Sequence, residues 1–149
     1  MKLESKHIVL YYPHKLNVCM NGLIKHDLII EEVLSIREYS GVVYFNNHCL
    51  PINGISWKPI LRQLSELDNY KDEILIRWGG GLPEKAKEKW VKSIIDEMKY
   101  TAYNALRYDF IEFMAEHHFD FMGLIPASLA VDINTLNKPK DSTGGYGGC

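Results

Sequence analysis

Residues 79–98, GGGLPEKAKEKWVKSIIDEM, decide the architecture that the sequence predicts. Pro83 follows the glycines and suits the first position of a helix, where a backbone N–H is not needed. From there apolar residues recur at helical spacing, which indicates an amphipathic helix rather than a strand. The apolar stripe consists of Ala86, Trp90, Val91, Ile94, Ile95 and Met98, and the opposite face carries Lys85, Glu88, Lys89, Lys92 and Asp96.

The helical spacing continues toward the C-terminus. It predicts either one long helix that bends near residues 100–104 or a pair of separate helices. The apolar stripe of this second stretch is formed by Tyr103, Leu106, Phe110, Phe113, His117 and Phe121.

Toward the N-terminus the pattern changes to short runs that end at turn residues. Runs rich in β-branched and aromatic side chains predict strands. One of them, Leu28–Ile36, also fits a helix, and a strand is favoured. The predicted strands are His7–Tyr12, Leu16–Met20, Leu28–Ile36, Val42–Phe45 and Glu73–Trp78.

Between these runs, Trp57–Leu67 is expected to be a helical or looped connector. Pro59 suits a first helical turn, and Ile60, Leu64 and Leu67 would then share one face. Because strands precede helices along the chain, the sequence predicts an α+β fold. In it, a small N-terminal antiparallel sheet is covered by C-terminal helices.

Size and charge narrow the class of protein. With 149 residues, 46% of them hydrophobic, the chain suits one domain, which we place at residues 1–136. The tail 137–149, NKPKDSTGGYGGC, is expected to be disordered or an added linker. The net charge of -2 gives no overall attraction to nucleic acid. We expect a cytoplasmic protein without membrane contact, since no stretch resembles a membrane span or a signal peptide.

The three cysteines are widely spaced and lack the paired spacing of a zinc site. Cys19 and Cys49 are therefore interpreted as small buried apolar residues in a reducing compartment. His48 beside Cys49 is a poor thiol–imidazole pair, because neighbouring residues on a strand point to opposite faces.

Two groups of residues are candidate ligand sites. Gly79, Gly80 and Gly81 could bind an anion through backbone N–H groups where a strand enters a helix, with help from Arg77, although the spacing of a phosphate loop is missing. Asp109, Glu112 and Glu116 would share a helix face near His117 and His118. A solvated face is favoured over a metal site there, and we expect neither a metal nor a cofactor.

A contact surface for a protein or ribonucleoprotein is the more favoured type of site. Exposed aromatic and Arg side chains are the usual anchors of such surfaces, and lysines can steer a partner. The residues expected to form it are Trp57, Arg77, Trp78, Lys85, Lys89 and Lys92.

Three blocks carry a resemblance to known sequences: MKLESKHIVLYYPHKLNV at residues 1–18, ISWKPILRQLSEL at 55–67 and HHFDFMGLIPASLAVDINTL at 117–136. They resemble small proteins of unassigned function that phages and prophages of Bacteroidota encode. The resemblance brings no catalytic motif. It implies an accessory protein that acts on host defence.

The expected function is therefore non-catalytic binding and inhibition of a host defence factor. An anti-CRISPR-type inhibitor of an effector protein or ribonucleoprotein is the favoured form. The alternative is a protein that sequesters a nucleotide signal of the immune response, in a pocket that would use Arg77, the glycines and His117-His118.

Overall fold

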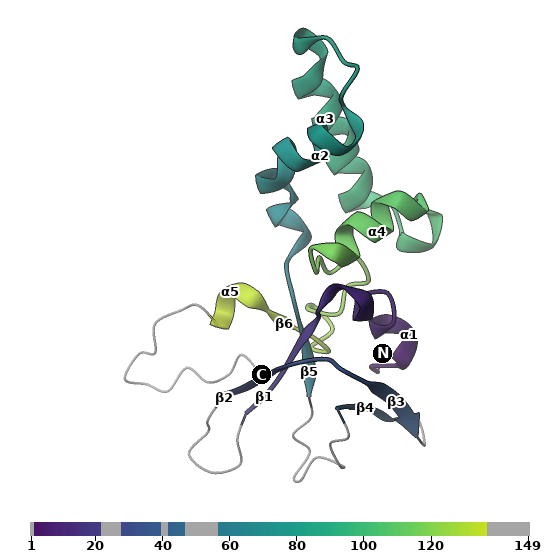
Figure 1. Ribbon diagram of the computed structural model, residues 1–149, viewed down its shortest axis with the longest axis vertical. Coiled ribbons are helices and arrows are strands. Elements are labelled where there is room, and N and C mark those ends of the chain that lie inside the picture. The colour runs from purple at the N-terminus through teal and green to yellow at the C-terminus, as the bar shows by residue number, and fades with distance from the viewer. Residues whose placement is uncertain (1, 22–27, 40–41, 47–56, 137–149) are drawn as a thin grey trace.

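The computed structural model describes residues 2–21, 28–39, 42–46 and 57–136 (Figure 1). It has an α+β fold, as the sequence predicts, with strands mainly in the N-terminal half and helices mainly in the C-terminal half. At one end of the molecule lie two small sheets, and a pair of helices projects from the other end.

The N-terminal segment is helical, so the strand predicted at His7–Tyr12 is wrong. Helix α1 spans Ser5–Ile8, and the 3-10 turn η1 spans Tyr12–His14. The backbone N–H of Glu4 donates to Nδ1 of His7 at 2.9 Å, and this local bond starts the helix. A short apolar run does not distinguish a strand from a buried helical turn, which explains the error.

The larger sheet has the strand order β2-β1-β5-β6. Strand β1 (Asn17–Asn21) pairs antiparallel with β2 (Leu28–Glu32) and with β5 (Lys58–Leu61), whereas β5 pairs parallel with β6 (Val131–Asp132). The sheet is therefore mixed rather than antiparallel, and it includes a strand from the C-terminal end of the described chain. The connector expected at residues 57–67 is instead a strand followed by a 3-10 helix.

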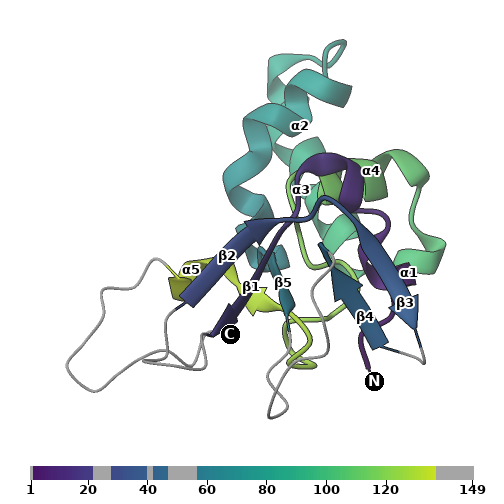
Figure 2. The same ribbon diagram turned by 60° about the horizontal axis from the view of Figure 1, so that its bottom comes forward.

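The second sheet is a two-stranded ribbon of β3 (Ile36–Tyr39) and β4 (Val42–Phe45), which lies beside the first sheet (Figure 2). The strand predicted at Val42–Phe45 is confirmed. Asn46, at φ 52°, joins the ribbon to the end of β2: its Oδ1 accepts the N–H of Leu34 at 2.6 Å, and its Nδ2 donates to the Glu32 carbonyl at 2.7 Å.

Cys19 on β1 is fully buried, and its sulfur takes part in a disulfide bond. The predicted burial of Cys19 is confirmed, but the reducing surroundings expected for it disagree with the disulfide. Widely spaced cysteines carry no pairing signal in the sequence. The other two cysteines lie outside the described residues. Disulfides are typical of oxidising compartments. The cysteines therefore no longer argue for the cytoplasmic location that the sequence predicts.

After the 3-10 helix η3 (Leu64–Tyr70), helices α2 (Lys71–Trp78) and α3 (Glu84–Tyr100) form an antiparallel hairpin. The strand predicted at Glu73–Trp78 is wrong. Strand alternation would put Ile74 and Ile76 on the same face, but Ile74 is 0% exposed and Ile76 is 82% exposed. Such a difference in exposure between positions two apart fits a helix. The burial of Ile74 in the core favours the helical conformation of this segment.

The second helical stretch resolves into a separate helix. A 3-10 turn η4 (Tyr103–Ala105) follows α3, and α4 (Tyr108–Glu116) runs beside the base of the hairpin (Figure 1). Of the two predicted alternatives, the helix pair is confirmed. A bent segment then leads to β6 and to α5 (Ile133–Leu136).

One apolar core connects these elements. It includes Ile8 and Tyr11 of the N-terminal segment, Leu61 of β5 and Ile74 of α2. Helices α3 and α4 and the segment after α4 add further residues that are at most 1% exposed: Val91, Ile95, Met98, Phe110, Phe113, Met114 and Phe119. The N-terminal turns, the sheet and the helices therefore depend on each other for burial.

Candidate functional site

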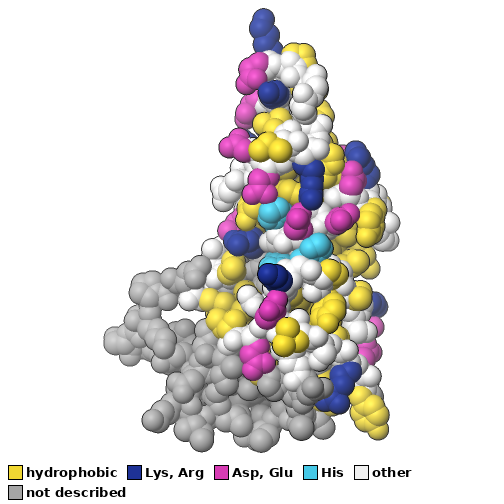
Figure 3. Space-filling view, viewed as in Figure 1, with side chains coloured by type: hydrophobic (Ala, Val, Ile, Leu, Met, Phe, Trp, Pro, Cys, Tyr) yellow, Lys and Arg dark blue, Asp and Glu magenta, His cyan; other side chains and the backbone are white. Residues whose placement is uncertain are grey.

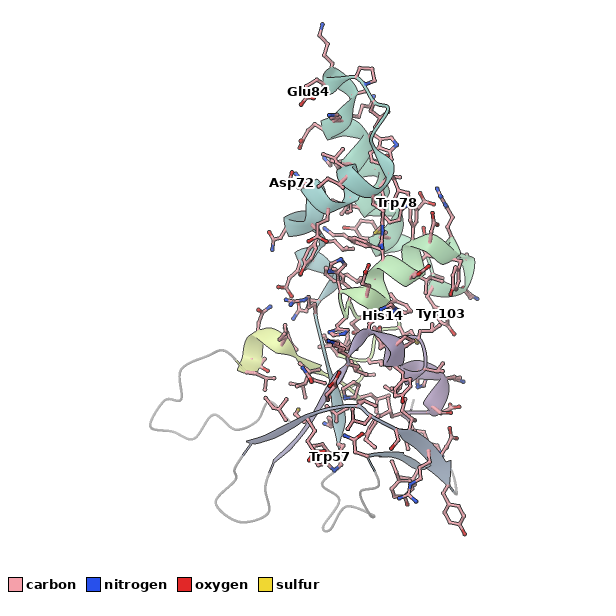
Figure 4. All side chains as sticks on the ribbon, viewed as in Figure 1. His14, Trp57, Asp72, Trp78, Glu84 and Tyr103 are labelled. Atoms are coloured by element: carbon pink, nitrogen blue, oxygen red, sulfur yellow. The ribbon has the colours of Figure 1, made fainter. Side chains whose placement is uncertain are left out.

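The hairpin of α2 and α3, residues 71–100, is the part of the molecule that extends farthest from the core, and we refer to it as the projection. Its tip is the turn at residues 79–83 and the start of α3, where Glu84 lies (Figure 4). The two sheets lie at the opposite end (Figure 1).

The three glycines form the tip of the projection and connect two helices. The expected transition from strand to helix is therefore wrong. The N–H of Gly79 donates to the Leu75 carbonyl at 2.8 Å and closes α2, so it does not face a ligand. At the start of α3, the acidic Glu84 already lies near the positive end of the helix dipole, where it pairs with Lys87 at 3.1 Å. These contacts weaken the case for an anion site.

Gly79 has a steric role. A Cβ atom at this position would lie 2.9 Å from the Leu75 carbonyl oxygen and 3.0 Å from its Cδ2 atom. At Gly80 and Gly81 a Cβ atom would have no neighbour within 4 Å. The close approach that ends α2 therefore requires glycine only at the first of the three positions.

Arg77 and Trp78 lie where the projection meets α4. The Arg77 guanidinium pairs with Glu116 at 2.9 Å and lies 5.3 Å above the Phe113 ring. Trp78 is half-buried, and its ring packs edge-on against Phe110 at a centroid distance of 5.2 Å (Figure 4). Trp78 therefore fixes the angle between the projection and α4, and the Arg77 side chain is held by α4 rather than by the glycines.

The predicted lysines Lys85, Lys89 and Lys92 are all exposed on α3. Their spacing places them along one side of the helix. Within residues 57–136, the salt bridges of Lys and Arg side chains on the projection use other cations: Arg77 with Glu116, Lys71 with Glu88 at 3.2 Å, Lys87 with Glu84, and Lys99 with Asp68 at 2.9 Å. Basic and acidic side chains alternate along this part of the surface (Figure 3).

Trp57 is 9% exposed and belongs to the apolar core at the sheet end of the molecule (Figure 4). The expectation that it is exposed for partner binding is therefore wrong. It precedes β5, and burial of a large aromatic side chain at the edge of the core contributes to folding rather than to a contact surface.

The carboxylates of α4 do not converge. Asp109 pairs with Arg107 at 2.6 Å, Glu116 pairs with Arg77, and Glu112 lines a separate cavity beside His14. Among the residues that the structure describes, no group of three His, Cys, Asp or Glu side chains is arranged to hold a metal ion.

The two histidines after α4 also separate. The Nε2 atom of His117 pairs with the Glu73 carboxylate at 2.9 Å, whereas His118 is turned inward and donates to the His14 carbonyl. Burial lowers the pKa of His118, an effect that the hydrogen bond to His14 opposes. His118 is therefore a structural contact between the N-terminal segment and the end of α4.

A shallow groove of about 340 Å³ lies between α2 and α4. Glu73 and Ile76 are not predicted as site residues, because a strand is expected at Glu73–Trp78 and the helical spacing between Glu73 and Arg77 then has no meaning. The groove is lined by Glu73, Ile76, Arg77, Phe113, Glu116 and His117.

A second cavity, of about 500 Å³, lies in the body of the protein, and we refer to it as the Asp120 cavity. Nothing in the sequence points to it, because its two walls are more than fifty residues apart in the chain. The walls are Gln63, Leu64 and Ser65 on one side and Asp120, Phe121, Gly123, Ile125 and Pro126 on the other.

Comparisons with known proteins find no match: no family model, no curated protein and no solved structure is significantly similar to this chain. Within the described residues, no helix combines the length and the apolar character of a membrane span.

Proposed function

We propose that the protein is a non-catalytic binding protein that inhibits a host defence factor, and that the projection is its contact surface. The single observation that supports this most directly is the row formed by Lys85, Lys89 and Lys92. The row is exposed on the part of the molecule that extends farthest from the core.

The charge of this row suggests the partner. In the described part of the chain, none of the three lysines forms a salt bridge, so their ammonium groups are available to a partner, although Glu88 and Asp96 are exposed on the same helix. A partner with an acidic surface would gain attraction and faster association from them. The phosphate backbone of the RNA in a ribonucleoprotein meets this requirement, and an effector protein would meet it through an acidic patch.

The projection also offers a rigid shape. Val91, Ile95 and Met98 of α3 are at most 1% exposed, so one face of the helix is fixed to the core while the opposite face is free. Ile76 of α2 is 82% exposed and adds an apolar contact. A stable complex needs about 800 Å² of buried area on each partner, and two exposed helix faces are a suitable platform for it.

The alternative function, sequestration of a nucleotide signal, has less support. A phosphate-bearing ligand needs cations or free N–H groups in its pocket. The Asp120 cavity is lined by no Lys, Arg or His side chain, and Arg77 is paired with Glu116. The glycine turn has one of its N–H groups bonded to Leu75.

The test is recovery of the tagged protein from host cells that carry the phage or prophage, with identification of proteins and RNA that come with it. The variant K85E/K89E/K92E is compared with K2E/K6E/K15E, which makes the same change of net charge away from the projection. Lys2, Lys6 and Lys15 are exposed on the N-terminal segment.

A partner that is lost only with the projection variant supports the proposal. A partner retained equally by both variants contradicts the assigned surface. Recovery of a bound nucleotide in place of any macromolecule would favour the alternative.

A further inference from the structure

We propose that the Asp120 cavity binds a small molecule that presents a cationic or neutral N–H donor group on an apolar body. This inference does not rest on the proposed function, because the cavity lies in the body of the protein and shares no residue with the projection.

The backbone holds the two walls of the cavity together. The N–H of Arg62 donates to the His118 carbonyl at 2.7 Å, and the N–H of Asp120 donates to the Arg62 carbonyl at 2.8 Å. This short parallel bridge continues β5 and fixes Gln63–Ser65 opposite the loop that begins at Asp120. The backbone bridge therefore fixes the spacing of the two walls, whose lining includes the exposed side chains of Gln63 and Ser65.

Asp120 is the charged group of the cavity and is only 5% exposed. Its Oδ1 accepts the N–H of Leu124 at 2.7 Å, and its Oδ2 accepts the N–H of Ile125 at 2.8 Å. These bonds shape the loop, which turns at Gly123 with φ +74°, a conformation that favours glycine. Gly123 also contributes a backbone hydrogen bond to Asp120. An ionised carboxylate has roughly four acceptor positions, so the three loop bonds leave about one for a ligand.

The other polar groups of the cavity also favour a ligand that donates hydrogen bonds. The Nε2 of Gln63 already donates to the Asp132 carboxylate, which leaves its carbonyl oxygen as an acceptor. The Ser65 hydroxyl is exposed and can accept or donate. Burial raises the pKa of the Asp120 carboxyl, while the loop N–H groups that donate to it act in the opposite direction. With its carboxylate ionised and no basic side chain among the lining residues, the cavity disfavours anions and favours cationic donors.

The remaining walls are apolar. Phe121 is 7% exposed, and its ring stacks on Tyr11 at a centroid distance of 5.1 Å, so its position is fixed. Leu64, Ile125 and Pro126 complete the wall. A volume of about 500 Å³ falls within the usual range for small-molecule sites. The chemistry therefore fits a ligand with a flat or aliphatic apolar part and one amine, amidine or amide-type donor.

The test uses benzamidine, which joins an amidinium group to an apolar ring, and benzoate, which has the same ring with an anionic group. Binding to the whole protein is measured by calorimetry and by chemical-shift changes. Benzamidine is expected to bind at least tenfold more tightly than benzoate, a difference typical of one charge-assisted contact of about 1.4 kcal/mol.

Two variants locate the site. Ser65→Trp places a large side chain at the exposed mouth and is expected to abolish benzamidine binding without a change in the unfolding temperature. Ser93→Trp is the matched control on exposed α3 and is expected to bind normally. Asp120→Asn is expected to weaken binding at least tenfold by removing the charge. Because both carboxylate oxygens also accept loop N–H groups, the unfolding temperature of this variant is measured alongside binding.

Benzamidine binding that survives Ser65→Trp would overturn the assigned site. Equal binding of benzoate, or no benzamidine binding up to about 20 mM, a limit well above the range of typical weak specific ligands, would overturn the chemistry.

Discussion

The Tyr11 hydroxyl donates a hydrogen bond to the main-chain carbonyl of Phe119, with an O···O distance of 2.7 Å. The two residues are 108 positions apart in the chain, so the bond joins the N-terminal turns to the segment after α4. Burial, with the nearby Asp120 carboxylate, raises the pKa of Tyr11 well above its usual value, and the hydroxyl therefore stays a donor.

Tyr11→Phe is expected to lower the free energy of unfolding by about 0.5–1.5 kcal/mol, because it removes a buried hydrogen bond to the Phe119 carbonyl, which then keeps only the N–H of Phe121 at 3.0 Å. Urea denaturation followed by circular dichroism measures the change. Tyr12→Phe is the control: the Tyr12 hydroxyl bonds to the Leu34 carbonyl at 2.6 Å on the surface, where water can replace it. Similar losses in the two variants would contradict the structural role of Tyr11.

The glycine turn can be tested in the same way. Gly79→Ala is expected to destabilise the protein by about 1–3 kcal/mol, because the new Cβ would force the end of α2 to move away from Leu75. Gly80→Ala is expected to change stability by less than about 1 kcal/mol, since the space around it is open. If both alanines are tolerated equally, the close approach at Gly79 is wrong.

The helical assignment of α2 predicts different effects for two isoleucines. Ile74→Ala is expected to cost about 2–5 kcal/mol, because it opens a cavity in the core, and Ile76→Ala is expected to stay within about 0.5 kcal/mol. Thermal and chemical unfolding of both variants provide the measurement. Large losses in both would favour the strand that the sequence suggests.

His118 predicts a dependence of stability on pH. Its pKa is lowered in the folded protein from an ordinary value of 6.5, mainly because the ring is buried. Below pH 6.5 the unfolded chain therefore binds this proton more readily than the folded one, and stability is lost as the pH falls through that window.

His118→Asn removes the titrating ring and tolerates the positive φ of 60° at this position. The variant is expected to be less stable at neutral pH, because the substitution removes the bond to His14. On acidification it is expected to lose less stability than the natural protein, because it has no titrating ring at this position. Chemical denaturation between pH 7 and pH 5 measures both slopes. Parallel slopes for the two proteins would show that His118 does not titrate in this way.

The sequence by itself determined the elements whose patterns are local. The apolar stripe of residues 86–98 lies on a real helix, α3, and Val42–Phe45 forms strand β4, because helical and strand periodicities were long or clearly bounded there. The α+β class followed from the order of these patterns. The exposed lysines Lys85, Lys89 and Lys92 could also be placed, since they lie opposite a buried stripe.

The tertiary structure alone decided the rest. Short apolar runs at residues 7–12 and 73–78 are compatible with two conformations, and packing against α3 and the core made both helical. The burial of Trp57, the disulfide of Cys19 and the Arg77–Glu116 pair depend on partners that are distant in the chain. The Asp120 cavity depends on the bridge between Arg62 and Phe119. No local pattern can reveal such sites, because their residues come together only when the chain folds and closes long loops, at a cost in conformational entropy.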